Sequence, residues 1–277
     1  MNFETLLYQK EDGIAVITIN RPERLNALNK KLMDVELPAV VEAIDKDPEV
    51  RCTVITGAKR ADGRPVFSVG GDIKEFRAIG FFEMLGPENI FDRAEAIFDW
   101  SEPLHESEKV FERIEASRKP YIAAVDGPCT AGGIEIALSC DIRIVSETAE
   151  ISDLHVKNMG QIGGAGATPR LARLVGPAMA KLMAWTGKIY NGREAVTIGF
   201  AQECYAPDKY LDEAKKLAKT IASMKPEAIR TAKFTINASM DMDLRQALRF
   251  SYLCAFAPHY KVMPPEQPGQ SFADRKK

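Results

Sequence analysis

Two short β-branched segments with a helical pattern between them constrain the fold of this chain more than any other feature. The segments are IAVITIN at residues 14–20 and CTVITGA at residues 52–58, and each ends at turn residues, as strands do. Between them, residues 29–50 carry apolar side chains at broadly helical spacing. Strands that alternate with helices in this way predict an α/β core.

The same alternation returns further along the chain. A helical pattern at residues 108–117 precedes the strand-like KPYIAAVDG at residues 119–127, a helix opens near Gly133, and residues 141–147 predict another strand. Beyond residue 171 most of the pattern is helical. We therefore predict a helical C-terminal subdomain, and we expect it to pack against the core because no low-complexity linker separates the two.

The charge of the chain excludes several classes of partner. The formal net charge is −2 and the lysines and arginines are scattered, so no broad basic stripe is available for nucleic acid or anionic lipid. No apolar run approaches the ~20 residues that cross a bilayer, and the N-terminal residues lack the pattern of a secretory signal. We expect a cytoplasmic protein that binds neither membrane nor nucleic acid.

The cysteines, histidines and glycines give no pattern for a metal or a nucleotide cofactor. The five cysteines are widely spaced without a CxxC pair, which is typical of reduced thiols, and the three histidines are too dispersed to indicate zinc. The glycines between Gly160 and Gly166 lack the G-x-G-x-x-G spacing of a dinucleotide site. We therefore expect neither a metal ion nor a separate cofactor.

Two glycine-rich turns that follow apolar strands are the first candidates for chemistry. They are PVFSVGGDIKEF at residues 65–76 and AAVDGPCTAGGIEI at residues 123–136. Glycine allows close approach of a ligand to the backbone, and a helix that starts after it presents unpaired N–H donors. Two such turns that face one carbonyl oxygen would form an oxyanion hole. Glu135 in the second turn could instead stabilise only its own helix N-terminus, because the helix dipole favours a carboxylate there.

Five segments occur in the order found in one known family. They are INRPERLNALN (19–29), VFSVGGDIKEF (66–76), AAVDGPCTAGGIEIALSCDIRI (123–144), GGAGATPRLARLVG (163–176) and TGKIYNGREAVTIGF (186–200). In these segments the chain resembles the crotonase superfamily, which includes the enoyl-CoA hydratases and isomerases. The resemblance implies an α/β spiral of ββα units, acyl-CoA thioesters as substrates, and a C-terminal helical trimerisation region. The implied division is a core with the CoA-thioester site at residues 1–199 and an oligomerisation region at 200–277.

The resemblance also assigns individual residues. It implies that the oxyanion hole is formed by the N–H groups of Gly71 and Gly132, and that Glu135 is the first catalytic glutamate. Further positions are implied to bind the substrate, with Lys74 near the CoA moiety and Phe272 in the C-terminal motif: Arg24, Ala27, Val69, Asp72, Ile73, Lys74 and Phe272. Coenzyme A enters this scheme only as part of the substrate.

The second catalytic glutamate of the hydratases has no counterpart here. Counted from the preceding strand, His155 takes its place, whereas counting back from Gly160 leads to Val156, and the alternative carboxylate Asp153 lies two residues before the histidine. A histidine can exchange a proton near neutral pH because its reference pKa is ~6.5. Family isomerases that rely on one glutamate tend to keep the second, so simple double-bond isomerisation is disfavoured.

These assignments favour a hydratase or lyase that holds the thioester oxygen as an enolate develops. Glu135 would act on water, and His155 or Asp153 would supply the second proton-transfer group. The loss of the second glutamate leaves C–C hydrolysis, decarboxylation and thioester hydrolysis as alternatives within the same fold. A non-catalytic CoA-binding protein is the alternative from another class, although such a protein has no need of Glu135.

Two further expectations concern the substrate and the assembly. Residues 80–107 contain five aromatic residues, and we expect them to border the acyl end of the pocket and to favour a bulky or cyclic acyl group. The same stretch could equally be local packing. We also expect a homotrimer or a dimer of trimers, because apolar residues at helical spacing near the C-terminus need to be covered: Leu244, Leu248, Tyr252 and Phe256.

Overall fold

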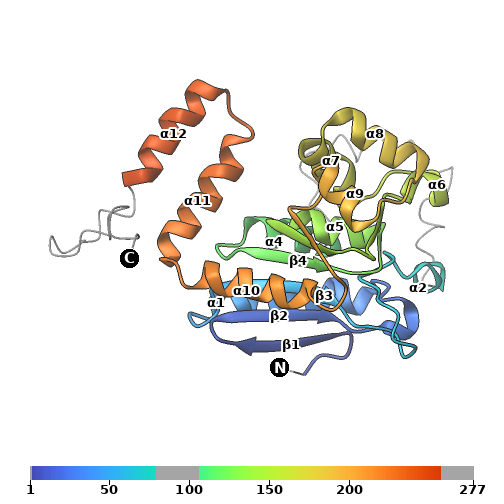
Figure 1. The fold of residues 1–277 in the computed structure, drawn as a ribbon. Helices are drawn as coiled ribbons and strands as arrows, with labels where there is room; N and C mark the ends of the chain where they lie inside the picture. The colour runs from blue at the N-terminus through green and yellow to red at the C-terminus, as the bar shows by residue number, and fades with distance from the viewer. Residues whose placement is uncertain (1, 79–105, 257–277) are drawn as a thin grey trace. The chain divides into compact units, whose positions relative to one another are not determined.

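The computed structural model describes residues 2–78 and 106–256, and within these ranges six strands form the main sheet (Figure 1). The strands are β1 (Leu6–Glu11), β2 (Ile14–Ile19), β3 (Cys52–Gly57), β4 (Tyr121–Val125), β6 (Ile142–Ser146) and β8 (Glu203–Tyr205). Their order across the sheet is β1-β2-β3-β4-β6-β8. The first pair is antiparallel and every later pair is parallel.

The antiparallel pair is a tight hairpin, and its turn explains how the chain reverses. Asp12 and Gly13, the two residues between β1 and β2, have φ values of 45° and 79°. Two consecutive residues with positive φ are typical of the type I′ turn, whose twist matches that of the flanking strands. The hairpin fixes the start of β2, from which the parallel part of the sheet extends.

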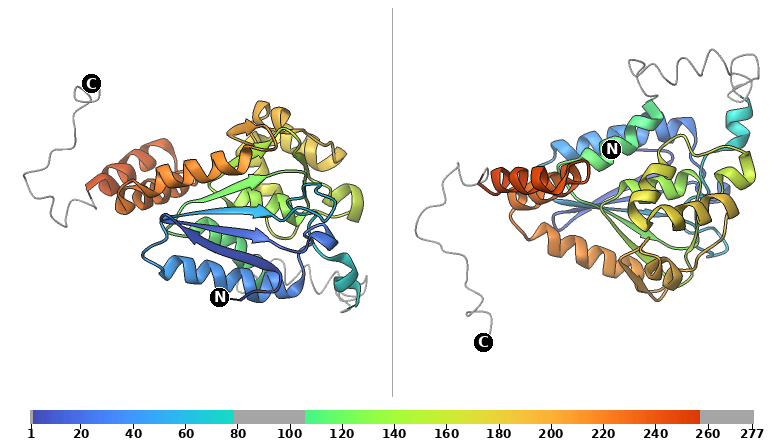
Figure 2. Two further views of the ribbon diagram at one scale, coloured as in Figure 1. Left: turned by 60° about the horizontal axis from the view of Figure 1, so that its bottom comes forward. Right: turned by 90° about the horizontal axis from the view of Figure 1, so that it is seen from above.

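Alternate side chains of the parallel strands are buried on opposite faces of the sheet. On β2, Ile14 and Val16 belong to one apolar cluster, whereas Ala15 and Ile17 belong to the other. Helix α10 (Tyr210–Ala222) covers the first face and contributes small side chains such as Ala214. Figure 2 shows that the helices α1 (Leu37–Lys46) and α4 (Glu106–Ala116) lie on the other face. Helices therefore cover both faces of the sheet and shield them from water, as is usual for a parallel sheet.

A second, smaller sheet carries the glycine turns. Strands β5 (Pro128–Thr130) and β7 (Glu150–Ser152) pair in parallel, and isolated bridges join Ser68 to Cys129 and Ile151 to Tyr190. Helix α5 (Gly132–Ser139) begins two residues after β5 and is buried along its whole length. The bridge between Ser68 and Cys129 thus brings the first glycine turn beside the second.

The remaining helices follow the sheet strands in the chain. They are η1 (Pro22–Arg24), η2 (Lys31–Glu36), α2 (Ile73–Ala78), α6 (His155–Met159), α7 (Ala167–Val175), α8 (Pro177–Thr186), α9 (Gly192–Thr197), α11 (Pro226–Ser239) and α12 (Leu244–Phe256). The helical pattern at residues 29–50 is not one α-helix, because η2 has π-helical hydrogen bonds before α1 begins. Pro38 lies in the first turn of α1 and has no N–H to bond the carbonyl four residues earlier.

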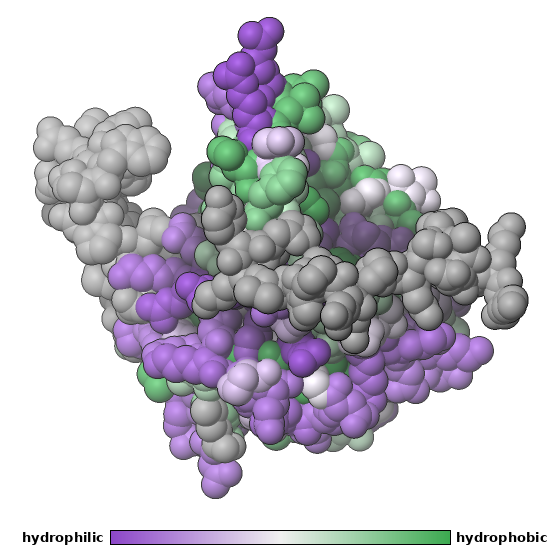
Figure 3. All heavy atoms as spheres, turned by 90° about the vertical axis from the view of Figure 1, so that its left-hand side faces the viewer, coloured by the Kyte–Doolittle hydropathy of each residue, from purple (hydrophilic) through white to green (hydrophobic). Residues whose placement is uncertain are grey.

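The chain divides into two compact units, Met1–Ser223 and Met224–Lys277. The helices expected from residue 200 onward therefore fall in both units, because α10 packs on the main sheet of the first. The second unit contains α11 and α12, which pack as a pair and carry many exposed apolar side chains, including Leu244, Leu248, Tyr252 and Phe256. Figure 3 shows hydrophobic residues gathered on the upper part of the face that it presents. None of the helices in the described ranges is long and apolar enough to cross a bilayer.

Candidate active site

The two glycine turns place two backbone amides side by side. A β-carbon built on Gly132 would lie 3.6 Å from the backbone nitrogen of Gly71, and one built on Gly70 would lie 2.7 Å from the nitrogen of Gly132. Within residues 2–78 and 106–256, neither the Gly71 nor the Gly132 N–H donates to a backbone acceptor. Two free donors that adjoin in this way form the arrangement required for an oxyanion hole.

Unusual backbone conformations build this pair of turns. Ala131, the residue before α5, has φ 50° and ψ −124°, a combination that L-residues rarely adopt. Gly70 has φ 91°, and a β-carbon there would also lie 2.5 Å from the Ala131 side chain, so only glycine fits. Such strain costs of order 1–3 kcal/mol and is concentrated at functional sites. Ala131 directly precedes Gly132, whose amide adjoins that of Gly71.

Glu135 lies in the first turn of α5, and its side chain is almost fully buried. Its Oε1 accepts hydrogen bonds from the backbone N–H groups of Ala165, at 3.0 Å, and Ala167, at 3.3 Å. Burial raises the pKa of the Glu135 carboxyl group above its usual range, while the two N–H donors and the nearby His155 act in the opposite direction. The site therefore holds a carboxylate that is a stronger base than a glutamate in water.

His155 is the first residue of α6 rather than part of a loop, and it forms a pair with Asp153. Its Nδ1 lies 2.8 Å from Asp153 Oδ1, which also accepts the His155 backbone N–H at 3.2 Å. Burial alone would lower the pKa of His155, but the hydrogen bond that the ring donates to Asp153 and the charge of Glu135 outweigh it and raise that pKa. Burial would raise the pKa of Asp153, but its bonds to His155 lower it. The pair thus favours imidazolium beside carboxylate.

The other ring nitrogen of His155 faces Glu135. His155 Nε2 lies 3.9 Å from Glu135 Oε2, and both side chains are buried. A β-carbon on Gly163 would lie 2.6 Å from Glu135 Oε1 and 2.6 Å from His155 Cε1, so only a glycine leaves room beside the two groups. The sequence did not single out Gly163 as a site residue, although it lies in one of the segments that carry the family resemblance.

Another predicted residue, Asp72, forms a buried ion pair that the sequence did not reveal. Its Oδ2 lies 2.9 Å from Arg21 Nη2, and its Oδ1 accepts the backbone N–H of Glu75 at the start of α2. Burial would raise the pKa of Asp72, but the bond from Arg21 outweighs it and lowers that pKa. Arg21 also donates to the carbonyl oxygen of Ala27. The Arg21–Asp72 pair therefore connects the segment after β2 to the turn that carries Gly71.

The other predicted substrate-binding residues differ in how far they are buried. Ala27 is buried and Val69 is half-buried, whereas Arg24, Ile73 and Lys74 are exposed. Phe272 and the aromatic segment at residues 80–107 lie outside the described residues, apart from the last two positions of that segment, which begin α4. No contact among the described residues assigns Arg24, Ile73 or Lys74 to the site, so their roles stay predictions.

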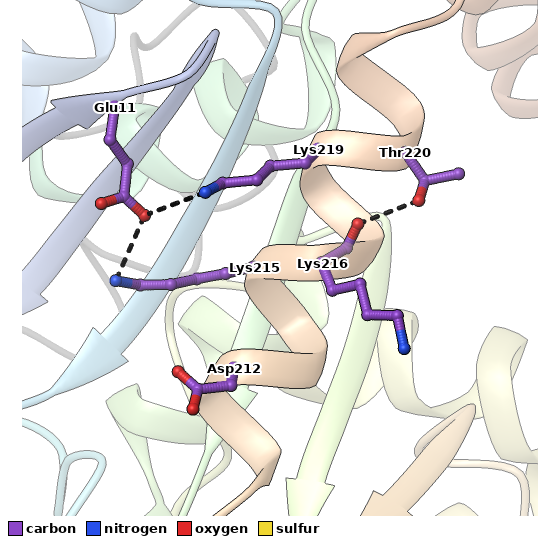
Figure 4. Close-up of a pocket in the computed structure, with 6 residues that line it drawn as sticks. All are labelled: Glu11, Asp212, Lys215, Lys216, Lys219 and Thr220. Carbon is purple, nitrogen blue, oxygen red and sulfur yellow. Dashed lines mark hydrogen bonds and ion pairs between the residues drawn. The ribbon is translucent and has the colours of Figure 1, made fainter.

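The remaining candidate sites in the described ranges offer no competing chemistry. Within residues 2–78 and 106–256, no group of three histidine, cysteine or acidic side chains could hold a metal ion. A surface hollow on α10 is lined by lysines, but Glu11 pairs with Lys215 and Lys219 there (Figure 4). Lys216 pairs with Glu213, so the charges of this hollow are already compensated.

Comparisons with known proteins find related sequences and structures over most of the chain. The family model described as Enoyl-CoA hydratase/isomerase matches residues 9–255. A short-chain-enoyl-CoA hydratase from Clostridium acetobutylicum is 37% identical over 250 residues, which cover 90% of this chain and 87% of that one. A crotonyl-CoA hydratase from Syntrophomonas wolfei is 35% identical over 259 residues, with the same coverage of 90% and 87%. The crystal structure of an enoyl-CoA hydratase subunit from Geobacillus kaustophilus matches with a TM-score of 0.78 and 30% identity, covering 93% of this chain and 91% of that one.

Proposed function

The chain belongs to the enoyl-CoA hydratase/isomerase family and has its fold, and on that basis we propose that it adds water to an enoyl-CoA thioester or removes water in the reverse reaction. One observation carries this proposal. The carboxylate of Glu135 and the imidazole of His155 face each other at 3.9 Å, and Glu135 lies on the helix that begins at Gly132, whose amide adjoins that of Gly71. A base, an acid and an oxyanion hole are the three elements that hydration requires.

The paired amides would bind the thioester oxygen. When water adds to the β-carbon of an enoyl thioester, negative charge develops on this oxygen as an enolate forms. Donors that are already oriented toward such an oxygen typically contribute about 2.7–4 kcal/mol each to transition-state stabilisation. Because Gly71 and Gly132 are held by fixed turns, the enzyme would not need to reorganise its backbone during the reaction.

Glu135 and His155 would divide the two proton transfers. Glu135 takes a proton from water as the oxygen bonds to the β-carbon, and His155 Nε2 gives a proton to the α-carbon as the enolate collapses. Glu135 is then protonated and His155 neutral, and transfer of that proton from Glu135 to His155 restores both groups. One water is consumed, its hydroxyl at the β-carbon and one hydrogen at the α-carbon, so the atoms and charges balance. Asp153 would hold the ring with Nε2 toward the substrate.

Hydrolysis is a second candidate, and one observation favours it. A histidine that is hydrogen-bonded to a buried aspartate is an arrangement suited to removing a proton from water, and the hydratase-type second glutamate is missing here. If His155 worked in its neutral form, the same oxyanion hole would serve C–C hydrolysis of a β-ketoacyl-CoA, hydrolysis of the thioester, or decarboxylation. A protein that only bound CoA esters is less favoured, because burial of an ionisable Glu135 has a cost that binding does not require.

The identity of the acyl group and the assembly also belong to this proposal. The aromatic residues in the segment 80–107 support a bulky or cyclic acyl group, and Lys74, Arg24 and Phe272 would contact the CoA moiety. The exposed apolar side chains of α11 and α12 support a trimer or a dimer of trimers. We propose a cytoplasmic enzyme that needs no metal ion or separate cofactor.

A thioester panel tests the proposal directly. Enoyl-, dienoyl- and β-ketoacyl-CoA esters are incubated with the protein, and the products are identified by mass spectrometry. Hydration gives a hydroxyacyl-CoA, thioester hydrolysis releases free CoA, and decarboxylation loses carbon dioxide. Glu135→Gln should abolish turnover while binding of the CoA ester stays within about tenfold, because the amide keeps the shape but removes the base. Comparable kcat in this variant would rule out the central role of Glu135.

A further inference from the structure

An arginine outside the reacting groups holds the loop that supports Glu135. Arg170 lies in the first turn of α7, and its Nη1 donates to the carbonyl oxygen of Ala165 at 2.7 Å. Ala165 is also the residue whose N–H donates to Glu135 Oε1 at 3.0 Å. Ala165 therefore accepts a hydrogen bond from Arg170 through its carbonyl group and donates one to the proposed base, Glu135, through its N–H group.

The guanidinium group is itself fixed by a second helix. Arg170 Nε and Nη2 both donate to Glu115 Oε2 at the end of α4, at 3.0 and 2.8 Å. The Arg170 side chain is 16% exposed and that of Glu115 is 47% exposed, so the guanidinium group is mostly shielded from water while its anchor lies at the surface. The pair thus connects α4 to the loop that precedes α7.

A glycine in the loop before α7 leaves space for the guanidinium group of Arg170. Gly166, between the two residues that donate to Glu135, has φ 92°, and a β-carbon there would lie 2.2 Å from Arg170 Nη1. The carbonyl oxygen of Gly166 accepts the backbone N–H of Arg170 at 3.3 Å. The next amide, that of Ala167, is the second donor to Glu135. Arg170 thus donates to the carbonyl oxygens of Ala165 and Gly166, which lie between the two N–H groups that donate to Glu135.

We propose that Arg170, anchored by Glu115, is a positioning residue that keeps the Ala165 and Ala167 amides directed at Glu135. The inference rests on the proposed function, because it assigns a purpose to the placement of the base. Arg170 does not contact the reacting atoms in this scheme. Its loss would let the loop residues move away from the carboxylate, and Glu135 would lose both position and hydrogen bonds.

Two readouts follow from this role, one kinetic and one independent of turnover. Loss of the amide donors destabilises the ionised form of Glu135, so its titration moves to higher pH; the other charged groups that face it are His155 and Asp153. Misplacement of a reacting group by about 1 Å can lower the rate about 100-fold, so we expect kcat to fall by roughly 10- to 100-fold with little change in KM.

The experiment compares Arg170→Met with Arg170→Lys, Glu115→Gln and the control Arg193→Met. Arg193 forms a surface ion pair with Glu147 on other elements, so its substitution removes a similar pair from a region that the mechanism does not use. The carboxyl resonances of protein labelled with ¹³C-glutamate are followed against pH, and the Glu135 resonance is assigned by its absence in Glu135→Gln. The kcat of each variant is measured on the best thioester.

The expected result is an upward shift of the Glu135 titration and a loss of kcat in Arg170→Met, smaller changes in Arg170→Lys and Glu115→Gln, and none in Arg193→Met. An unchanged titration overturns the proposal, even if kcat falls, because the arginine would then be merely structural. If Arg170→Met does not fold, the two milder variants decide by the same readouts. A protein that turns over none of the thioesters refutes the proposed function, whereas the titration still decides the role of Arg170.

Discussion

Replacement of Asp153 by asparagine is the most informative perturbation of the site. Asp153 Oδ1 accepts both the Nδ1–H and the backbone N–H of His155, at 2.8 and 3.2 Å. Asparagine keeps the size of the side chain but removes its charge, and its NH₂ group can donate to Nδ1. The neutral ring would then carry its proton on Nε2, the nitrogen that faces Glu135. Such a ring cannot accept a proton from the α-carbon when water is eliminated.

The expected magnitude follows from the role of the pair. Loss of a general acid–base group typically costs 10²–10⁴-fold in rate, so we expect kcat of Asp153→Asn to fall within this range. The pKa of His155 should also fall, because the hydrogen bond and charge that raise it are reduced. In a plot of kcat against pH, the limb that reports loss of the imidazolium proton should therefore lie at lower pH in Asp153→Asn than in wild type.

The stability of the variant has a defined pH dependence. The pKa of Asp153 is lowered by folding, so its contribution exists above about 3.9 and is lost as pH falls through the folded value. The pKa of His155 is raised, so its contribution is complete below about 6.5 and is lost as pH rises through the folded value. Wild type should therefore exceed Asp153→Asn most clearly between pH ~4 and ~6.5, by about 1.5–3 kcal/mol for one charged hydrogen bond.

The assay is a kcat profile from pH 5 to 9 for both proteins, combined with urea unfolding at pH 5.5 and pH 9. Asp62→Asn is a matched control, because Asp62 pairs with Arg64 on an exposed loop. The reasoning fails if Asp153→Asn retains kcat within threefold of wild type, or if the stability difference is the same at pH 5.5 and pH 9. Either outcome would make the pair a structural feature.

Three further predictions concern the pocket, the acyl group and the assembly. Gly163→Ala places a methyl group 2.6 Å from both proposed acid–base side chains, so kcat should fall at least tenfold with normal circular dichroism, and an unaffected kcat would show that the pocket can adjust. A bulky or cyclic enoyl-CoA should have a higher kcat/KM than crotonyl-CoA, and the opposite order would refute a role of residues 80–107 in acyl selection. Sedimentation should show a trimer or hexamer that Leu248→Asp dissociates, because Leu248 is 63% exposed in the single chain; a stable wild-type monomer contradicts this.

The sequence was most informative where buried side chains recur over several residues. The central strands and the start of α5 were confirmed within one or two residues, because apolar runs that are bounded by turn or polar residues have few alternatives. Strand β1 was not predicted because its burial pattern is irregular and its sequence, LLYQKE, ends in charged residues. The three-residue strands β5, β7 and β8 are too short to show a period of two.

The sequence named candidate residues for the site but could not indicate how their side chains are arranged. Counting from either side of the HVKNM segment gave two different partners for Glu135, His155 and Val156, and no local pattern shows which side chain faces the glutamate. The structure shows that the His155 ring faces Glu135 while Asp153 bonds the opposite ring nitrogen. The Arg21–Asp72 pair joins residues 51 positions apart, which no local pattern could reveal. The catalytic roles of these residues stay predictions.

A histidine at this position changes the electrostatics of the site, and that change gives the arrangement a physical logic. Two buried carboxylates at this separation would repel each other, so one of them would be protonated over much of the neutral range. Opposite Glu135, an imidazolium stabilises the ionised glutamate, and the glutamate in turn helps to keep the imidazolium protonated. The hydration-competent state, with a charged base and a charged acid, is therefore favoured by mutual attraction. Asp153 adds a second negative charge behind the ring, so the buried imidazolium lies between two carboxylates that compensate its charge.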